Sequence, residues 1–202
     1  VPSERAPLGA PERQRPVPAT VRPAPAAPRT PPPDAATIAA AIERLARENP
    51  MERELAQKQL RAAGAAAVPA LINALEDENA PARRAAIAVL GQIRDPRAAE
   101  PLAALLGTSS TPTWNVLSGA FRALGGEAAP ALVDALGSGD DIARSRAAEL
   151  MGAIADPRFA DPLIERLNRD RHSGVRVKIA EALGRIGERS ACEALLVMLD
   201  EP

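Results

Sequence analysis

The sequence predicts an all-α fold: a right-handed α-solenoid of about five and a half helical-hairpin repeats, preceded by an extended proline-rich tail. Apolar residues recur with a period of about 31 residues, which is typical of stacked helix pairs. The first 33 residues hold 11 of the 21 prolines. Aromatic residues are scarce, with two Phe, one Trp and no Tyr, so we expect a core of Ala, Leu, Ile and Val between closely spaced helices.

The composition divides the chain into a tail, residues 1–33, and a repeat domain, residues 34–202. The tail contains five arginines and only two glutamates, and its apolar residues other than proline are Ala, Val and one Leu. Such a segment cannot offset its ordering entropy by burial, so an extended, polyproline-like conformation is expected. The tail is interpreted either as a flexible spacer or as an arm that lies across a neighbouring protein.

The repeat domain opens with a helix that has no partner helix in its own repeat. Asp34 is a favourable N-cap, and the apolar residues that follow predict a helix over residues 35–48, which Asn49-Pro50 ends. Its distance from Arg53 matches the distance between the second helix of a repeat and the arginine after it. We therefore expect a half-repeat that caps the stack.

Two series of apolar anchors define the full repeats. The first series closes the first helix of each repeat: Leu60, Leu90, Phe121, Met151 and Leu183. The second series lies in the second helices: Leu71, Leu102, Leu132, Leu163 and Leu195. Both recur every 30 to 32 residues, which predicts five repeats of two amphipathic helices each.

The turns between paired helices carry matching signals. Asp95-Pro96 and Asp156-Pro157 each read as an N-cap followed by proline at the first helical position. Three glycines occupy the corresponding turns, where a left-handed C-cap suits glycine: Gly64, Gly125 and Gly187. Repeats one and three are one residue shorter between their anchors than the others.

Charged residues recur with the same period. An arginine stands seven residues before four of the first anchors: Arg53, Arg83, Arg144 and Arg176. Trp114 holds this place in repeat three, while Asp77 and Asp170 lie six residues before two of the arginines. This pattern, with Ala-Val-Leu-Gly-Gln-Ile at 88–93, resembles the HEAT-repeat family over residues 35–202, in particular its short, bilin-lyase-type repeats.

The resemblance implies a structural ladder, in which an aspartate of the inter-repeat turn and the arginine that opens the next helix link neighbouring repeats. Repeat three departs from it, because Thr108 and Trp114 replace the ladder pair, so a looser or specialised joint is expected there. For function, the resemblance implies an adaptor or scaffold, the role of most family members.

The sequence contains no catalytic constellation. His172 is the only histidine and Cys192 the only cysteine, which excludes an internal disulfide and a cysteine-based metal cage. We interpret His172 as a solvated turn residue, Cys192 as a buried thiol, and the acidic run 76–78 as helix capping instead of calcium binding. No enzyme activity, cofactor, metal or small-molecule substrate is expected.

The outward side of the second helices points to a protein partner. Two residues after each second anchor lies a neutral to acidic stripe: Asn73, Ala104, Asp134, Glu165 and Val197. With a formal net charge of −1, this stripe argues against nucleic acid, which requires a basic face. The expected partner is a protein or a multi-subunit complex.

Trp114 is the best single candidate for binding, because Trp is enriched at interface hot spots. The alternative is that it fills the gap left by the missing arginine. Met198 belongs to an apolar run, residues 195–199, which predicts a further repeat or a partner that covers this face.

These features predict a non-catalytic interaction scaffold. The alternative is a permanent structural subunit of a larger bacterial complex, and a chromophore-handling lyase is a distant third reading. No apolar run approaches the ~20 residues of a membrane span. Because the chain opens with Val1, it is either processed or a fragment, and we weigh an extracytoplasmic location above a cytoplasmic one.

Overall fold

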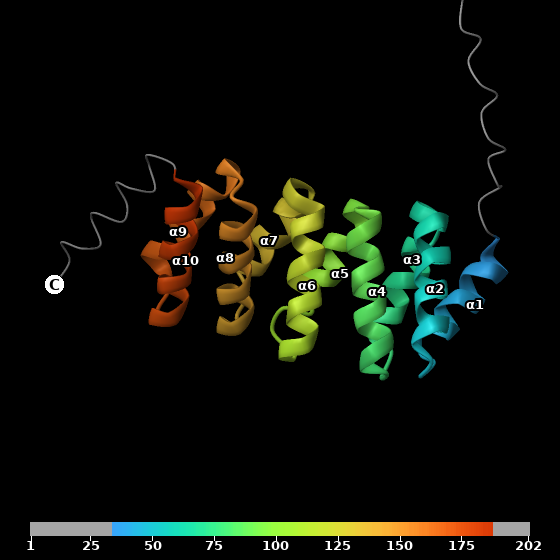
Figure 1. The fold of residues 1–202 in the computed structure, drawn as a ribbon. Helices are drawn as coiled ribbons and strands as arrows, with labels where there is room; N and C mark the ends of the chain where they lie inside the picture. The colour runs from blue at the N-terminus through green and yellow to red at the C-terminus, as the bar shows by residue number, and fades with distance from the viewer. Residues whose placement is uncertain (1–33, 188–202) are drawn as a thin grey trace, which may run out of the picture. The chain divides into compact units, whose positions relative to one another are not determined.

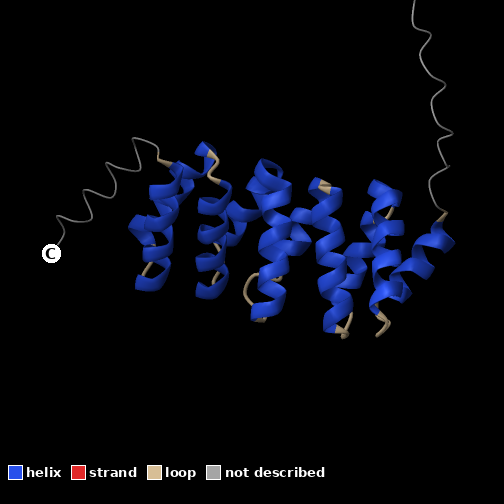
Figure 2. Ribbon diagram, in the orientation of Figure 1, coloured by secondary structure: helices blue, strands red, loops and turns tan. Residues whose placement is uncertain are grey.

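The computed structural model describes residues 34–187, in which helices joined by short turns make up the fold (Figure 2). Long helices stand side by side in one row, each against its neighbour along the chain (Figure 1): α2 (Pro50–Ala63), α4 (Ala80–Ile93), α6 (Thr111–Leu124), α8 (Asp141–Ile154) and α10 (Ser173–Ile186). A second row holds shorter helices: α3 (Val68–Asn73), α5 (Ala99–Ala103), α7 (Ala129–Leu136) and α9 (Ala160–Arg169). This arrangement confirms the predicted helical solenoid.

The second helix of each repeat includes 3-10 turns. Such turns lead into all four short helices: η1 (Gly64–Ala66), η3 (Pro96–Ala98), η4 (Gly125–Ala128) and η5 (Pro157–Phe159). A further turn, η2 (Ala74–Glu76), follows α3. The second elements are therefore shorter as α-helices than the long row, whose members have 14 residues each.

The half-repeat is helix α1 (Ala35–Leu45), which packs against α2. Asp34 caps it as predicted, because its carboxylate accepts a hydrogen bond of 2.8 Å from the Thr37 amide. The expected end at residue 48 is wrong: the helix stops at Leu45. Asn49 caps the next helix, with Pro50 at the first position, and this start requires extended backbone at Asn49.

Every first helix ends with the same hydrogen bond. Four residues after each first anchor, a cap residue with positive φ donates its amide to the anchor's carbonyl: Gly64, Arg94, Gly125, Ala155 and Gly187. The predicted left-handed cap holds for Gly187, at φ 72° and ψ 14°. Arg94 and Ala155 adopt it too, although both carry a Cβ.

Gly64 and Gly125 do something different, and this explains the shorter repeats. Their φ is 57° and 59°, but their ψ is −132° and −135°, a region that only glycine enters readily. From this conformation the 3-10 turn starts at the glycine itself. In repeat two a left-handed Arg94 and an extended Asp95 precede the turn that starts at Pro96, and α5 therefore begins nine residues after its anchor Leu90, whereas α3 begins eight residues after Leu60.

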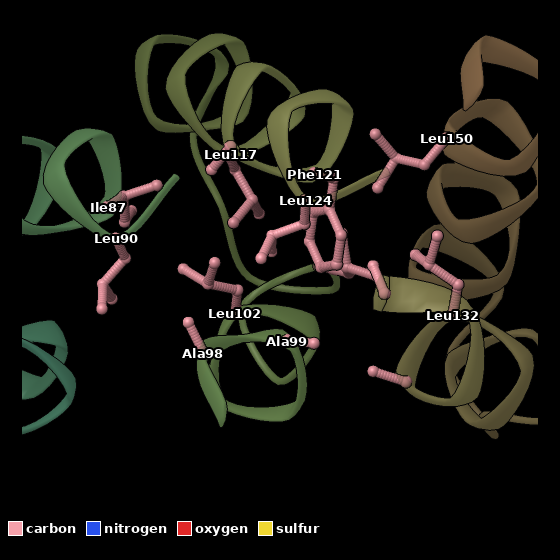
Figure 3. Packing of buried hydrophobic residues seen from close by; sticks show 14 of the residues in the cluster. Ile87, Leu90, Ala98, Ala99, Leu102, Leu117, Phe121, Leu124, Leu132 and Leu150 are labelled. Carbon is pink, nitrogen blue, oxygen red and sulfur yellow. The ribbon is translucent and has the colours of Figure 1, made fainter. Parts of the chain in front are cut away.

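One continuous apolar core fills the space between the rows. All first anchors are fully buried, as are the second anchors Leu71, Leu102, Leu132 and Leu163. Figure 3 shows Phe121 of α6 between Leu102 and Leu132, with Leu90 of α4 and Leu150 of α8 at either side. Leu195 lies outside the described residues. Because each repeat covers the apolar faces of its neighbours, the core extends along the whole stack of described repeats and is not concentrated at one point.

Candidate interaction surface

The ladder arginines staple the turns that precede them, in the sense that each holds its turn by hydrogen bonds to main-chain carbonyls. Each guanidinium reaches back to a main-chain carbonyl six residues earlier in the chain: Arg53 to Arg47, Arg83 to Asp77, Arg144 to Ser138 and Arg176 to Asp170, over 2.6–3.0 Å. The Asp77 carboxylate does not pair with Arg83; it accepts the amide of Asn79 at 2.8 Å. The arginines thus satisfy carbonyls that no helix uses.

Asp170 makes one buried ionic link between repeats. Its carboxylate accepts from Arg144 Nε at 2.7 Å and from Nη2 at 3.3 Å, and from Arg166 Nε at 2.7 Å. The Asp170 side chain is fully buried and that of Arg144 is 9% exposed. Burial raises the pKa of Asp170, but hydrogen bonds from Arg144, the His172 amide and Arg166 outweigh it and hold the pKa well below its usual value.

Trp114 lies partly buried against the core at the start of α6. The guanidinium of Arg146, on α8, stands 5.1 Å from the centre of its ring. Arg146 also donates to the carbonyls of Leu106 and Ser109, the latter at 2.9 Å. Ser109 belongs to the turn whose own arginine is replaced by Trp114, so an arginine of the next repeat staples this turn.

Sequence reasoning did not single out Arg146. A signal was present, because at the same place in the other first helices, five residues before the anchor, stand Leu55, Ala85, Val116 and Lys178. Arg146 stands at this place one repeat after Trp114, where the ladder arginine is missing, and this indicates that Arg146 replaces that arginine.

The predicted stripe on the second helices is exposed where it is described. Asn73, Asp134 and Glu165 are all solvent-accessible on α3, α7 and α9. Val197 and Met198 lie outside the described residues. We call this side of the short row the short-helix face.

A groove of about 350 Å³ lies on the short-helix face between α5 and α7. Its walls carry the carboxylates of Glu100, Asp134 and Asp140, and alanines such as Ala131 line it. A hollow of about 240 Å³ adjoins it, shares Glu100 and Asp134, and adds Glu127. No arginine or lysine lines either hollow. The groove is therefore a carboxylate-rimmed depression with small apolar side chains.

Within residues 34–187, no group of three or more His, Cys, Asp or Glu side chains could hold a metal ion. His172 is 55% exposed, and its Nε2 lies 3.3 Å from a carboxylate oxygen of Asp141. Cys192 is not among the described residues. The described part of the chain also contains no helix that is long and apolar enough to cross a membrane.

The stacked helix pairs, the stapled turns and the continuous core together define a helical-repeat protein. The HEAT repeat family matches residues 38–125 and 129–202, so this chain belongs to the HEAT-repeat family, as the resemblance implied. A comparison with curated proteins finds no match.

Solved structures also match this chain. A chain from the structural study of microtubule plus-end tracking by XMAP215, CLIP-170 and EB1 is 16% identical, with a TM-score of 0.60 over 80% of this chain and 84% of that one. This likeness shows the fold alone. The complex of CpcE and CpcF of phycocyanin lyase from Nostoc sp. PCC7120 matches with 25% identity over 74% of this chain and 99% of that one, at a TM-score of 0.47.

Proposed function

We propose that this protein is a non-catalytic interaction scaffold that binds a protein partner through the short-helix face. Membership of a solenoid family supports this proposal, because stacked repeats expose long, continuous surfaces of the kind that bind other macromolecules. The observation that carries it is the carboxylate-rimmed groove between α5 and α7. Trp114 is half-buried and already covered by Arg146, so it acts mainly as a filler of the joint.

The chemistry of the groove favours a partner segment with arginine or lysine side chains. The carboxylates of Glu100 and Asp134 form no ion pair with any described basic residue. The alanines between them leave room for the apolar stem of a long basic side chain, while its charged end meets the carboxylates. Complementary charge of this kind speeds association and selects the partner.

The test compares partner recovery by two charge-matched double variants of the full chain. Glu100→Gln/Asp134→Asn removes two groove carboxylates, whereas Glu43→Gln/Glu54→Gln removes two exposed carboxylates from α1 and α2. Copurification from the source cells with quantitative mass spectrometry should show one protein that is lost with the groove variant and kept with the control. Equal recovery by both variants would refute the groove as the binding surface.

The same experiment addresses the alternative of a permanent structural subunit. A regulated adaptor releases its partner as ionic strength rises, because salt screens the attraction between the groove carboxylates and the basic side chains of the partner. A permanent subunit retains its neighbours in fixed stoichiometry through the same wash, since obligate interfaces are large and apolar.

A further inference from the structure

The four described full repeats are of two alternating kinds. Residues of repeats one and two recur in repeats three and four at a constant distance of 61 positions, without a gap: Leu60 and Phe121, Gly64 and Gly125, Arg83 and Arg144, Gly91 and Gly152, Asp95 and Asp156, and Leu102 and Leu163. The residue after the first anchor alternates accordingly in these four repeats, as Arg61, Gly91, Arg122 and Gly152; in repeat five it is Gly184. Neighbouring joints therefore cannot be alike.

Gly91 and Gly152 allow neighbouring long helices to pack closely, because they carry no side chain. A Cβ at Gly91 of α4 would lie 2.6 Å from the Cα of Ala120 in α6, and one at Gly152 of α8 would lie 2.6 Å from the Cα of Ala182 in α10. At these two positions the backbones lie so close together that there is no room for a side chain. The α4–α6 and α8–α10 joints are therefore locked by direct backbone packing, and each unites two repeats into one rigid pair.

The joint between these pairs, α6 against α8, is built differently. The equivalent position of α6 is the exposed Arg122, and α6 and α8 come close over far fewer residues than either locked pair does, since α8 packs against repeat three mainly through α7. A prominent link across this joint is Arg146, through its hydrogen bonds to Leu106 and Ser109 and its position over Trp114. Such polar contacts near the surface are exchanged for water at small net cost.

We propose that the α6–α8 joint is a hinge between two rigid repeat pairs and that Arg146 is its latch. With Arg146 engaged, the turn before α6 is tied to α8. With Arg146 released, the pairs rotate about the joint, and the depression between α7 and α9, which is lined by Val133, Leu136 and Pro162, changes its width. Hinges of this kind concentrate movement in one joint while the packed elements on both sides stay intact.

Pulsed electron resonance on the full chain tests the hinge. In a Cys192→Ser background, spin labels at Gln92 and Ala153 span the hinge, and labels at Gln92 and Val133 lie within one locked pair; all three sites are exposed. Arg146→Ala should shift and broaden the distance distribution of the spanning pair and leave that of the other pair unchanged. Two equally broadened distributions, or none, would overturn the proposal.

A second variant separates a latch from a mere support of the turn. Trp114→Arg places a ladder arginine on α6 itself, from where it can staple the turn without help from α8. If Arg146 acts as a latch, Trp114→Arg/Arg146→Ala keeps the broad distribution across the hinge. If the double variant returns to the width of the parent, Arg146 only supports the turn and the hinge proposal fails.

Discussion

At the scale of single residues, the ladder arginines differ in what they hold. Within the described residues, Arg83 donates only to main-chain carbonyls of its own turn, and these carbonyls can bind water when the arginine is removed. Arg144 holds two such carbonyls and also the fully buried carboxylate of Asp170. Removing Arg144 takes away that carboxylate's main buried partner, so we expect the two arginines to contribute unequally to stability.

We predict that Arg144→Ala lowers the free energy of unfolding by about 3 kcal/mol, because a buried carboxylate loses its main partner. Arg83→Ala should cost about 1 kcal/mol, the usual net value of hydrogen bonds that water can replace. Chemical denaturation of both variants and the parent measures the difference. Equal losses would contradict a special role of the Arg144–Asp170 pair.

The same pair sets a pH dependence. The pKa of Asp170 in the folded chain lies below its unfolded value of about 3.9. Its contribution is therefore complete above that unfolded value, and it is lost as the pH falls below it towards the folded pKa. Unfolding free energies measured between neutral and strongly acidic pH should fall more steeply for the parent than for Asp170→Asn. Parallel curves would show that the carboxylate contributes nothing.

At the scale of elements, the sequence predicted much of the fold because its signals are local. Anchors at helical spacing, the Asp34 cap and the proline at position 96 each act within a few residues, and the structure has them as expected. Backbone geometry of the turns was beyond such reasoning. Glycine can adopt both the left-handed conformation of Gly187 and the different conformation of Gly64. The sequence therefore does not distinguish the two turns.

A substitution at Gly64 separates the effect of backbone conformation from that of steric clash. A Cβ at Gly64 would meet nothing within 4 Å, yet its backbone is one that other residues avoid, so Gly64→Ala should destabilise the protein by about 1–3 kcal/mol. Gly119 is also free of neighbours but lies inside α6, so Gly119→Ala should stabilise by about 0.5–1 kcal/mol. Thermal unfolding of both variants checks the opposite signs.

Gly91→Ala tests the close approach of α4 and α6. The added methyl group would meet main-chain atoms of Ala120, which can move only if the whole helix moves, so we expect a loss of about 1–3 kcal/mol. Chemical denaturation measures this loss, and Gly119→Ala serves again as the control. An unchanged midpoint would show that the two helices are not locked.

At the scale of the whole molecule, the period of 30 to 32 residues predicted the solenoid, because repetition alone implies stacking. The candidate surface was predictable only in part. The acidic character of Asp134 and Glu165 was visible in the sequence. The groove was not, because Glu100 and Asp140 join Asp134 through contacts between repeats that no single repeat encodes. Arg146 was missed for the same reason, since its partners belong to the preceding repeat.

The tail stays a prediction, because residues 1–33 lie outside the described part of the chain. Since the first described helix begins at Ala35 with Asp34 as its cap, deleting residues 1–33 should leave the circular dichroism spectrum per helical residue and the melting temperature unchanged. Retention of the shortened chain in its complex should weaken if the five arginines bind a partner. Assembly with undiminished affinity would identify the tail as a spacer.

The 61-residue period limits how this chain can change its length. Removing residues 80–140 would join Asn79 directly to Asp141, so that Asn79 takes the capping place of Asp140 and α2 meets α8 with Leu60, Arg61 and Gly64 in the places that Phe121, Arg122 and Gly125 hold now. Removing residues 80–110 would instead place α6, with its exposed Arg122, beside α2, with Arg61, and would lose the close packing at Gly91. We therefore expect that removing this pair of repeats preserves the order of the joints, while removing one repeat disturbs it.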